Sequence, residues 1–487
     1  MTIITSQDPS SPVAAVTIAA PEMKQPANEA GNTRQRAMLH GPILPTLLKL
    51  ALPTVVVLVV QTLVGVAETY FVSFLGTEAV AGVSLVFPIF MLMQMMSNGG
   101  IGGGVASSIA RAIGAGMVAE AEALVLNALV LAVVFGVIFT GAEWVFGETV
   151  YRLLGGQAGA LGAALDYGHT VFLGAVFVWI VSLLAAALRG AGNTLAPAAV
   201  ILLGVVVLLP LSPALIFGWG PFPRLGVAGA GIAVVVYYLV GAVILIAYLR
   251  SAKTSLRLPF DMRLVTWRRL GDILRVGALS AFGTIQSNLT VVLITGAVGL
   301  FGTDAIAGYG IASRLDYLQI PLLFALGSAA LSMVGVNIGA GQIKRAERIA
   351  WVAALFAAGV TELLGLFVTL FPHAWLMLFS TNPEVLAAGS IYFRVVAPFY
   401  GPTGLGMLLY FAGQGAGRVM WPVLGGAVRL LVAAGAGWIV VAYLGGGLRE
   451  LFIAVAGGSI ISAVIVAAAL WLRGWGPRST RESSPWD

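Results

Sequence analysis

The feature that most constrains this chain is a series of apolar runs, each long enough to cross a lipid bilayer as a helix. Crossing the hydrocarbon core takes roughly 20 consecutive apolar residues. Only 9% of the 487 residues are charged and 59% are hydrophobic, whereas soluble proteins carry about 25% charged residues. We therefore predict an all-α integral membrane protein with twelve transmembrane helices, at residues 46–71, 80–107, 122–146, 160–188, 194–218, 228–249, 273–298, 306–334, 349–371, 385–413, 419–443 and 451–472.

Polar stretches divide these runs into two sets of six. The N-terminal stretch is polar and interrupted by four prolines, and a basic stretch separates the two sets. The predicted organisation is a disordered cytoplasmic N-terminal tail (1–41), a first six-helix bundle (42–250), a basic cytoplasmic linker (251–272), a second six-helix bundle (273–473) and a cytoplasmic C-terminal tail (474–487).

The basic residues predict the orientation in the membrane. If both termini are cytoplasmic, twenty of the 26 Lys and Arg residues fall on the inner side, three fall outside, and Arg314, Arg394 and Arg429 fall within runs. Such an excess follows the positive-inside rule. We expect a multi-pass protein of the cell's inner (cytoplasmic) membrane with both termini inside. The same rule explains the basic linker without a nucleic-acid partner, although such a charge run can also bind anionic lipid headgroups.

The two halves carry related sequences. Leu75–Gly82 (LGTEAVAG) matches Phe301–Gly308 (FGTDAIAG), and Ile113–Gly116 matches Ile338–Gly341, at offsets of 226 and 225 residues. Because each half has an even number of spans, both enter the membrane from the same side, so the repeat is parallel. Paired repeats of this kind place a substrate between the halves, which favours a transporter over a receptor or scaffold.

Enzyme chemistry finds little support. The chain has no cysteine, and its three histidines are far apart in sequence. The glycine run Gly99–Gly104 fits neither common nucleotide-binding motif, while Gly102, Ala106, Ala110 and Gly114 form a row of small residues typical of close helix packing in membranes. We predict no enzymatic activity, no cofactor, no metal site and no nucleotide binding.

Glu68 is the residue most indicative of function, because it lies well inside the first apolar run. A charged side chain at mid-bilayer costs roughly 2.5 kcal/mol or more and usually marks an ion pathway. Gln61 lies two helical turns earlier on the same face, and Pro53 removes a backbone hydrogen bond and creates a place to bend. We interpret Glu68 as the ion-coupling acid, Gln61 as a cavity residue and Pro53 as a hinge.

Two further acids are secondary candidates. Glu362 has mostly apolar neighbours and could face either a cavity or a partner helix. Asp316 follows Arg314 by two residues, so a local charge pair competes with a transport role. Asp166 falls in the first third of its run, and His169, one turn further on, is expected to be a structural histidine.

Taken together, the twelve spans in two related halves, the pattern Pro53…Gln61…Glu68 before Leu75-Gly-Thr, and the Gly-Ala-Gly turns resemble the MATE (multidrug and toxic compound extrusion) transporters. The pattern is closer to the DinF-like branch than to the NorM-like branch. The resemblance implies two six-helix bundles in a V, cation-coupled efflux, and a coupling role for the acid at position 68, where Glu replaces the usual Asp.

The chain departs from that family pattern at two places. The fifth-span motif Asn-x-x-x-Asp-Pro corresponds here to Leu208…Ser212-Pro213, and the acids of NorM-like seventh and tenth spans are missing. The seventh span instead offers Gln286 and Asn288, which we take as further cavity candidates. Losing these acids disfavours a sodium site, so protons are the expected coupling ion and sodium the second choice.

We therefore predict a secondary antiporter, expected to be monomeric, that exports small amphipathic, preferably cationic, organic compounds in exchange for protons. The first alternative is a flippase for lipid-linked saccharides, in which arginines within the spans would bind pyrophosphate. The alternative from another class is a passive channel. An intramembrane enzyme is the weakest alternative, since no pair of catalytic groups at a recognisable spacing is present.

Overall fold

The computed structural model describes residues 27–251 and 254–475, and these are helical apart from short connections. The first half contains α1 (Ala27–His40), α2 (Ile43–Ser73), α3 (Thr77–Met95), η1 (Met96–Ile101), α4 (Gly102–Gly114), α5 (Val118–Leu153), α6 (Ala158–Leu173), α7 (Ala175–Gly190), α8 (Leu195–Phe217) and α9 (Val227–Arg250). The second half contains η2 (Met262–Leu264), α10 (Trp267–Gly299), α11 (Thr303–Gly339), α12 (Ile343–Leu370), α13 (Pro372–Leu376), α14 (Pro383–Val395), η3 (Ala397–Phe399), α15 (Tyr400–Gly415), α16 (Met420–Arg429), η4 (Leu430–Ala436), α17 (Gly437–Tyr443) and α18 (Leu448–Arg473).

The predicted set of membrane spans is confirmed. Within the described residues, eleven continuous or nearly continuous helices are long and apolar enough to cross a bilayer. The twelfth span is the pair α6 and α7, which bend by 48° at Gly174. The spans are longer than the apolar runs suggest; α5, for example, continues to Leu153, seven residues beyond the predicted end of its run.

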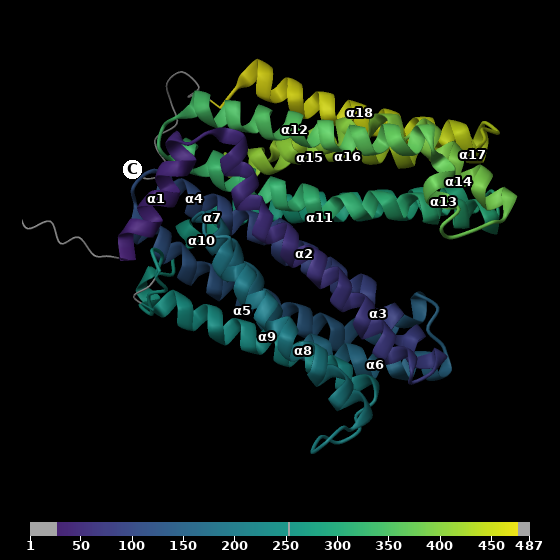
Figure 1. Ribbon diagram of the computed structural model, residues 1–487, viewed down its shortest axis with the longest axis horizontal. Helices are drawn as coiled ribbons and strands as arrows, with labels where there is room; N and C mark the ends of the chain where they lie inside the picture. The colour runs from purple at the N-terminus through teal and green to yellow at the C-terminus, as the bar shows by residue number, and fades with distance from the viewer. Residues whose placement is uncertain (1–26, 252–253, 476–487) are drawn as a thin grey trace, which may run out of the picture.

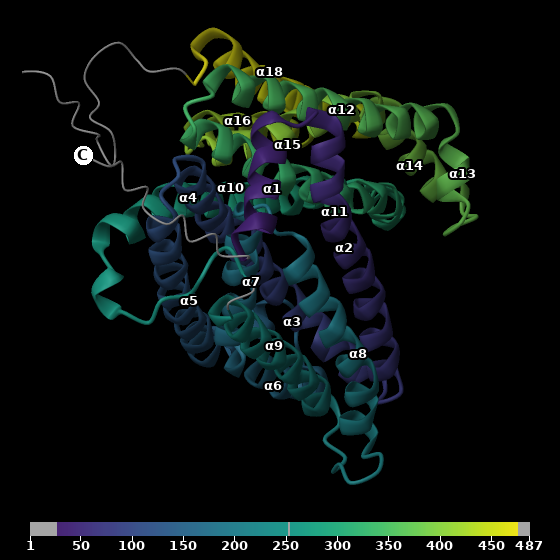
Figure 2. The same cartoon turned by 60° about the vertical axis from the view of Figure 1, so that its left-hand side comes forward.

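The helices form two lobes that diverge from a common end (Figure 1). Helices α2 to α9 make up one lobe and α11 to α18 the other, while α10 packs against both η1 and α4 of the first half and α16 of the second. The rotated view in Figure 2 gives the same arrangement, with α1 lying across the end where the lobes meet. The divergent end of each lobe lies farthest from α1.

The internal repeat is visible in how each lobe holds its broken span. In the first lobe, Gly136 packs against the start of α7, and the Thr140 hydroxyl donates to the carbonyl of Phe172 at 2.6 Å. In the second lobe, Gly365 packs against η3, and the Thr369 hydroxyl donates to the carbonyl of Phe393 at 3.2 Å. The same Gly-x-x-x-Thr pattern therefore packs against a broken helix in both halves. At such a break, backbone carbonyls lose their helical partners, and the threonine hydroxyl donates to one of them.

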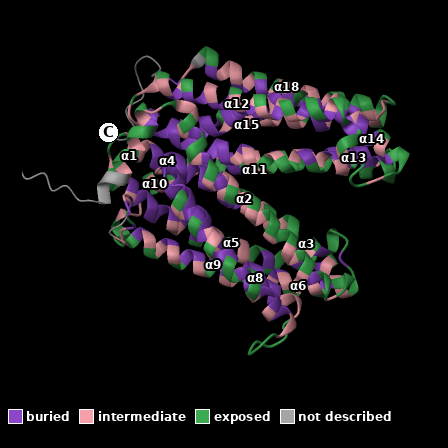
Figure 3. Cartoon of the chain, viewed as in Figure 1, coloured by how far each residue is buried: buried purple, intermediate pink, exposed green. Residues whose placement is uncertain are grey.

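Small residues join the lobes at their common end, where buried residues concentrate (Figure 3). A Cβ atom added to Gly114 of α4 would lie 2.0 Å from the carbonyl oxygen of Val336 on α11, and one added to Gly104 would lie 2.3 Å from that of Ile273 on α10. A Cβ atom added to Gly335 of α11 would lie 2.6 Å from the Cβ atom of Ala110 on α4. The row of small residues predicted on α4 is therefore confirmed as a packing surface between helices.

The N-terminal region differs from the expected disordered tail. Residues 27–40 form α1 because its side chains find partners in both lobes: Met38 is 1% exposed, and its carbonyl accepts from Asn337 at 3.1 Å, while Gln35 donates to the carbonyl of Ile113 at 2.9 Å. The expectation of disorder is wrong for this segment, and residues 1–26 lie outside the described residues. The predicted linker also ends early, since α10 already begins at Trp267; the C-terminal tail beyond residue 475 is not described.

Candidate functional site

Glu68 lies on α2, half-buried against α8 of the same lobe. The hydroxyl of Ser212 donates to Oε2 of Glu68 at 2.8 Å. The other carboxylate oxygen, Oε1, is buried and has no hydrogen-bond partner among the described residues. Ser212 stands where the resemblance expects an acid, so a hydroxyl replaces a second carboxylate beside the first. A carboxylate with one satisfied and one unsatisfied oxygen has room for a proton or a cation.

Tyrosines and amides continue the polar site from Glu68 toward the interior of the first lobe. Tyr167 of α6 lies next to Glu68, and the Tyr237 hydroxyl of α9 pairs with Gln61. Tyr237 contacts Tyr238 edge-on, with ring centroids 4.7 Å apart. Because Tyr167 also lies close to Tyr238, Gln61 and Glu68 belong to one cluster, and their roles in transport stay predictions.

The cluster extends to α3 through residues that the sequence argument did not single out. Gln94 donates to the hydroxyl of Tyr238, and Asn98 donates to Oε1 of Gln94 at 3.2 Å. Gln94 and Asn98 are four residues apart, hence on one helical face; Gln94 lies in the last turn of α3 and Asn98 within the π-helical turn η1. The spacing of these two amides inside an apolar run could have identified them from the sequence as candidate site residues.

Pro53 lies in the N-terminal third of α2, and the helix continues through it to Ser73. Because proline has no backbone N–H, one intrahelical hydrogen bond is missing there. A long helix with one absent bond is the expected place for a change in curvature. Its role as a hinge remains a prediction.

The two cavity candidates of α10 face different surroundings. Gln286 is buried against α16, where Gly426 is its close neighbour, and its Oε1 has no hydrogen-bond partner within the described part of the chain. Asn288 is exposed and donates to the sulfur of Met95 on α3 at 3.7 Å. Asn288 thus faces the first lobe, and the structure does not bring it together with Gln286 or Gln61.

Asp316 on α11 lies at the centre of an aromatic cluster in the second lobe. The Tyr392 hydroxyl donates to its Oδ2, and Tyr309, Tyr400 and Arg429 surround it. The local pair expected with Arg314 is not formed, because that guanidinium instead lies 5.6 Å from the ring centroid of Phe379. Glu68 in the first lobe and Asp316 in the second thus both lie beside tyrosines.

Glu362 binds the N-terminus of a neighbouring helix in its own lobe. Its Oε2 accepts from the backbone N–H of Gly401 at 2.7 Å, in the first turn of α15. A carboxylate at a helix N-terminus satisfies a free N–H and interacts favourably with the helix dipole. Of the two alternatives left open by the sequence, the partner helix is the one observed.

Glu143 on α5 is a buried acid that the sequence argument missed. It is 5% exposed, accepts from the Tyr151 hydroxyl at 3.2 Å and leaves Oε2 without a partner among the described residues. His169 lies close to it, with its ring stacked on Trp144 at 4.7 Å between centroids. Asp166, by contrast, is exposed.

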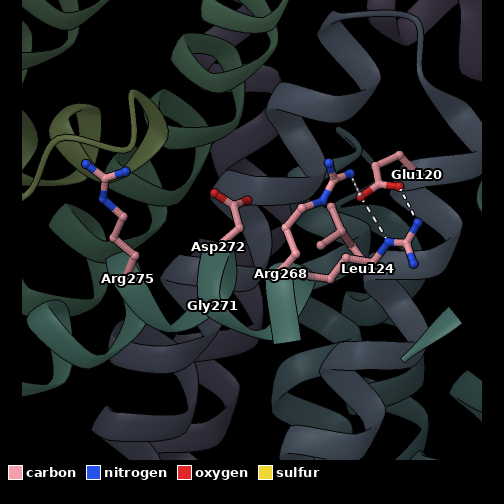
Figure 4. A pocket seen from close by; sticks show the side chains of 7 residues that line it. Glu120, Leu124, Arg268, Gly271, Asp272 and Arg275 are labelled. Carbon is pink, nitrogen blue, oxygen red and sulfur yellow. Dashed lines mark hydrogen bonds and ion pairs between the residues drawn. The ribbon is translucent and has the colours of Figure 1, made fainter. Parts of the chain in front are cut away.

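Ion pairs close the common end of the lobes. Arg111 of α4 makes two bonds of 2.9 Å to Asp272 of α10, and Arg269 of α10 makes a 2.7 Å bond to Glu120 of α5. Arg268 reaches the same Glu120 at 3.7 Å between Nη2 and Oε1. Both residues line a small cavity, drawn in Figure 4. Both sets join the first half of the chain to α10, so they hold the lobes together at this end.

The described residues contain no group of three or more His, Cys, Asp or Glu side chains placed to hold a metal ion. The candidate site consists of two polar clusters, one around Glu68 in the first lobe and one around Asp316 in the second. The two lobes are joined at one end by small residues and ion pairs.

Comparisons with known proteins agree on one family. The MatE family model matches residues 53–214 and 280–439. The chain is 31% identical over 382 residues to the FAD transporter of Shewanella oneidensis, covering 78% of this chain and 83% of that protein. It is 28% identical over 382 residues to the probable multidrug resistance protein NorM of Thermotoga maritima, covering 78% and 81%. Its structure resembles that of a MOP superfamily transporter from Pyrococcus furiosus, with a TM-score of 0.80, 25% identity and coverage of 90% and 97%.

Proposed function

The chain belongs to the MATE family of multidrug efflux transporters, and from this membership we propose that it exports small amphipathic organic compounds in exchange for protons. The observation that carries the proposal is the Glu68 carboxylate, which is half-buried within a membrane span and, among the described residues, accepts a hydrogen bond through Oε2 but not through Oε1. A single carboxylate that can hold either a proton or a cationic substrate, and not both, is sufficient for antiport.

The arrangement of the lobes supports a sequence of steps. Both termini are cytoplasmic in this proposal, so the divergent ends face outward and the ion pairs close the cytoplasmic side. A proton from outside neutralises Glu68 and removes the charge that attracts a cationic substrate. The hydrogen bond from Ser212 then weakens, because a neutral acid is a poorer acceptor than a carboxylate. Bending of α2 near Pro53 completes release of the substrate.

The test is pH-jump-driven movement of a fluorescent cation in everted vesicles, comparing wild type with Glu68→Gln. We expect wild-type transport and, in the variant, dye binding without pH-driven movement. Asp166→Asn is the matched control, since that acid is exposed and lies in the same lobe. Equal transport by wild type and Glu68→Gln would place the coupling acid elsewhere, with Asp316 next. Repeating the assay with a sodium gradient at constant pH separates the two ions.

A second candidate substrate class is an anionic dinucleotide. The relative from Shewanella oneidensis is named a FAD transporter, and arginines within the spans of this chain could bind phosphate groups. Vesicle uptake of FAD beside the fluorescent cation distinguishes the classes, because an anion should not compete with a proton at Glu68. Uptake of FAD that is unaffected by Glu68→Gln would favour this candidate.

A further inference from the structure

A cavity of about 480 Å³ lies beside α13 and α14, at the end of the second lobe far from the lobe junction. Its polar lining consists of His373, Ser390 and Arg394, and its apolar lining includes Leu386 and Ile391. No acidic side chain is among the lining residues. The volume falls within the range of small-molecule sites, and the mixture of cationic and apolar walls suits an amphipathic anion.

Arg394 is the first indication that something binds here. It lies eleven residues beyond the start of α14, about 16 Å along a membrane span. Among the described residues it has no hydrogen bond or ion pair, whereas Arg314 of the same lobe is stacked on Phe379. An arginine within a span is costly unless it finds a partner, and such residues usually mark ligand or ion sites.

Ser390 is an independent indication. It is only 8% exposed, and its hydroxyl has no hydrogen-bond partner among the described residues. Leaving a buried hydroxyl unsatisfied costs about 1–3 kcal/mol. Ser390 lies one helical turn before Arg394, so both line the same side of α14. His373, in the first turn of α13, also lines the cavity and adds a further nitrogen.

We propose that this cavity binds the phosphate group of an amphipathic anion, with Arg394 as the principal ligand and Ser390 as a second donor. Guanidinium groups bind phosphate through paired, charge-assisted hydrogen bonds. Leu386 and Ile391 contact the apolar part of the ligand. Two sources share this chemistry: an anionic phospholipid of the surrounding leaflet, and a phosphate-bearing substrate on its way out.

The experiment titrates purified full-length protein with dioctanoyl phosphatidylglycerol, with dioctanoyl phosphatidylcholine and with FAD, using isothermal calorimetry. Phosphatidylglycerol should bind more tightly than phosphatidylcholine, because the lining offers no acid to pair with choline. Arg394→Gln should weaken anion binding by at least about tenfold, the equivalent of about 1.4 kcal/mol, and Ser390→Ala by a smaller factor. Arg314→Gln is the matched control and should leave binding unchanged.

The source follows from competition. If FAD displaces phosphatidylglycerol and Arg394→Gln also slows saturable FAD transport, the cavity is a substrate site. If phosphatidylglycerol binds and FAD does not compete, it is a lipid site. The unliganded melting temperature of each variant verifies that it folds. Equal anion affinities for wild type and Arg394→Gln, or no binding of either anion, overturn the proposal.

Discussion

Replacing Asp272 by Asn should loosen the closed end of the molecule. Arg111 makes two bonds of 2.9 Å to this carboxylate, and the two side chains are only 14% and 28% exposed. Fully exposed ion pairs contribute about 0–1 kcal/mol, whereas charge-assisted bonds sheltered from water contribute about 1.5–3 kcal/mol. For this partly buried pair we take about 2 kcal/mol. Because the pair joins α4 to α10, its loss should favour the state in which this end is open by about 30-fold.

Opening can be measured by thiol labelling, since the natural chain has no cysteine. Ser280 of α10 is fully buried beside Ala281, which packs on Gly100 of η1 in the first half of the chain. A Ser280→Cys background should therefore react slowly, at a rate proportional to the open population. Asp272→Asn should raise that labelling rate by about 30-fold when it is measured without denaturant and at a temperature below the onset of unfolding.

The control is Arg152→Gln, which removes an ion pair with Glu148 within one exposed helical face, with side chains 62% and 57% exposed. It should change the labelling rate less than about twofold. Arg111→Gln should raise the rate similarly, because the further bonds of Arg111, to Ser107 and Ser108, lie within α4 itself and do not join α4 to α10. The double variant should add little, because both single changes remove the same contact between the two helices. An unchanged labelling rate in Asp272→Asn would refute the reasoning that this pair holds the lobes together.

Three further predictions concern architecture and orientation. Gly365→Ala should lower the melting temperature, because the new methyl group would lie 2.1 Å from a carbonyl oxygen of η3. Overpacking of this kind costs about 1–3 kcal/mol. The control Gly141→Ala should not destabilise the protein, because a methyl group added there has no other atom within 4 Å. Glu362→Gln should retain pH-driven transport while losing about 0.3–1 kcal/mol of helix-dipole stabilisation, and loss of coupling in a folded variant would contradict a capping role. Single cysteines at Lys344 and Thr381 should react with impermeant reagents from the cytoplasmic and outer sides respectively, and the reverse pattern would invert the proposed topology.

The spans and their repeat could be predicted from the sequence because both depend on local composition. A membrane helix must satisfy its own backbone, so a long apolar run has few other structures available. The ends of helices are harder to predict from the sequence than their presence, and this explains why Glu143 was missed. The predicted run ends at residue 146, but α5 continues to Leu153, which leaves Glu143 buried within the helix rather than near its end.

The partners of the polar residues could be predicted only where they share a helix. Gln61 and Glu68 are two turns apart and do belong to one cluster, whereas the contribution of Tyr237 depends on how α9 packs against α2. Helical geometry alone could have separated Gln286 from Asn288, since two residues correspond to about 200° of rotation. The contact of Glu362 with the start of α15 required knowing that its neighbouring span is broken at η3.

The glycine-lined contact between α4 and the helices α10 and α11 has a consequence for how such a protein can change over evolution. At Gly104 and Gly114 backbone approaches backbone, so neither glycine places a side chain of its own between the helices at these points, and the angle between the lobes can change there. The preferred angle is then set at the rim, by charged residues such as Arg111 and Asp272. Replacing one of these charged residues can therefore shift the equilibrium between the closed and open states of this end of the molecule without repacking the interior of either lobe.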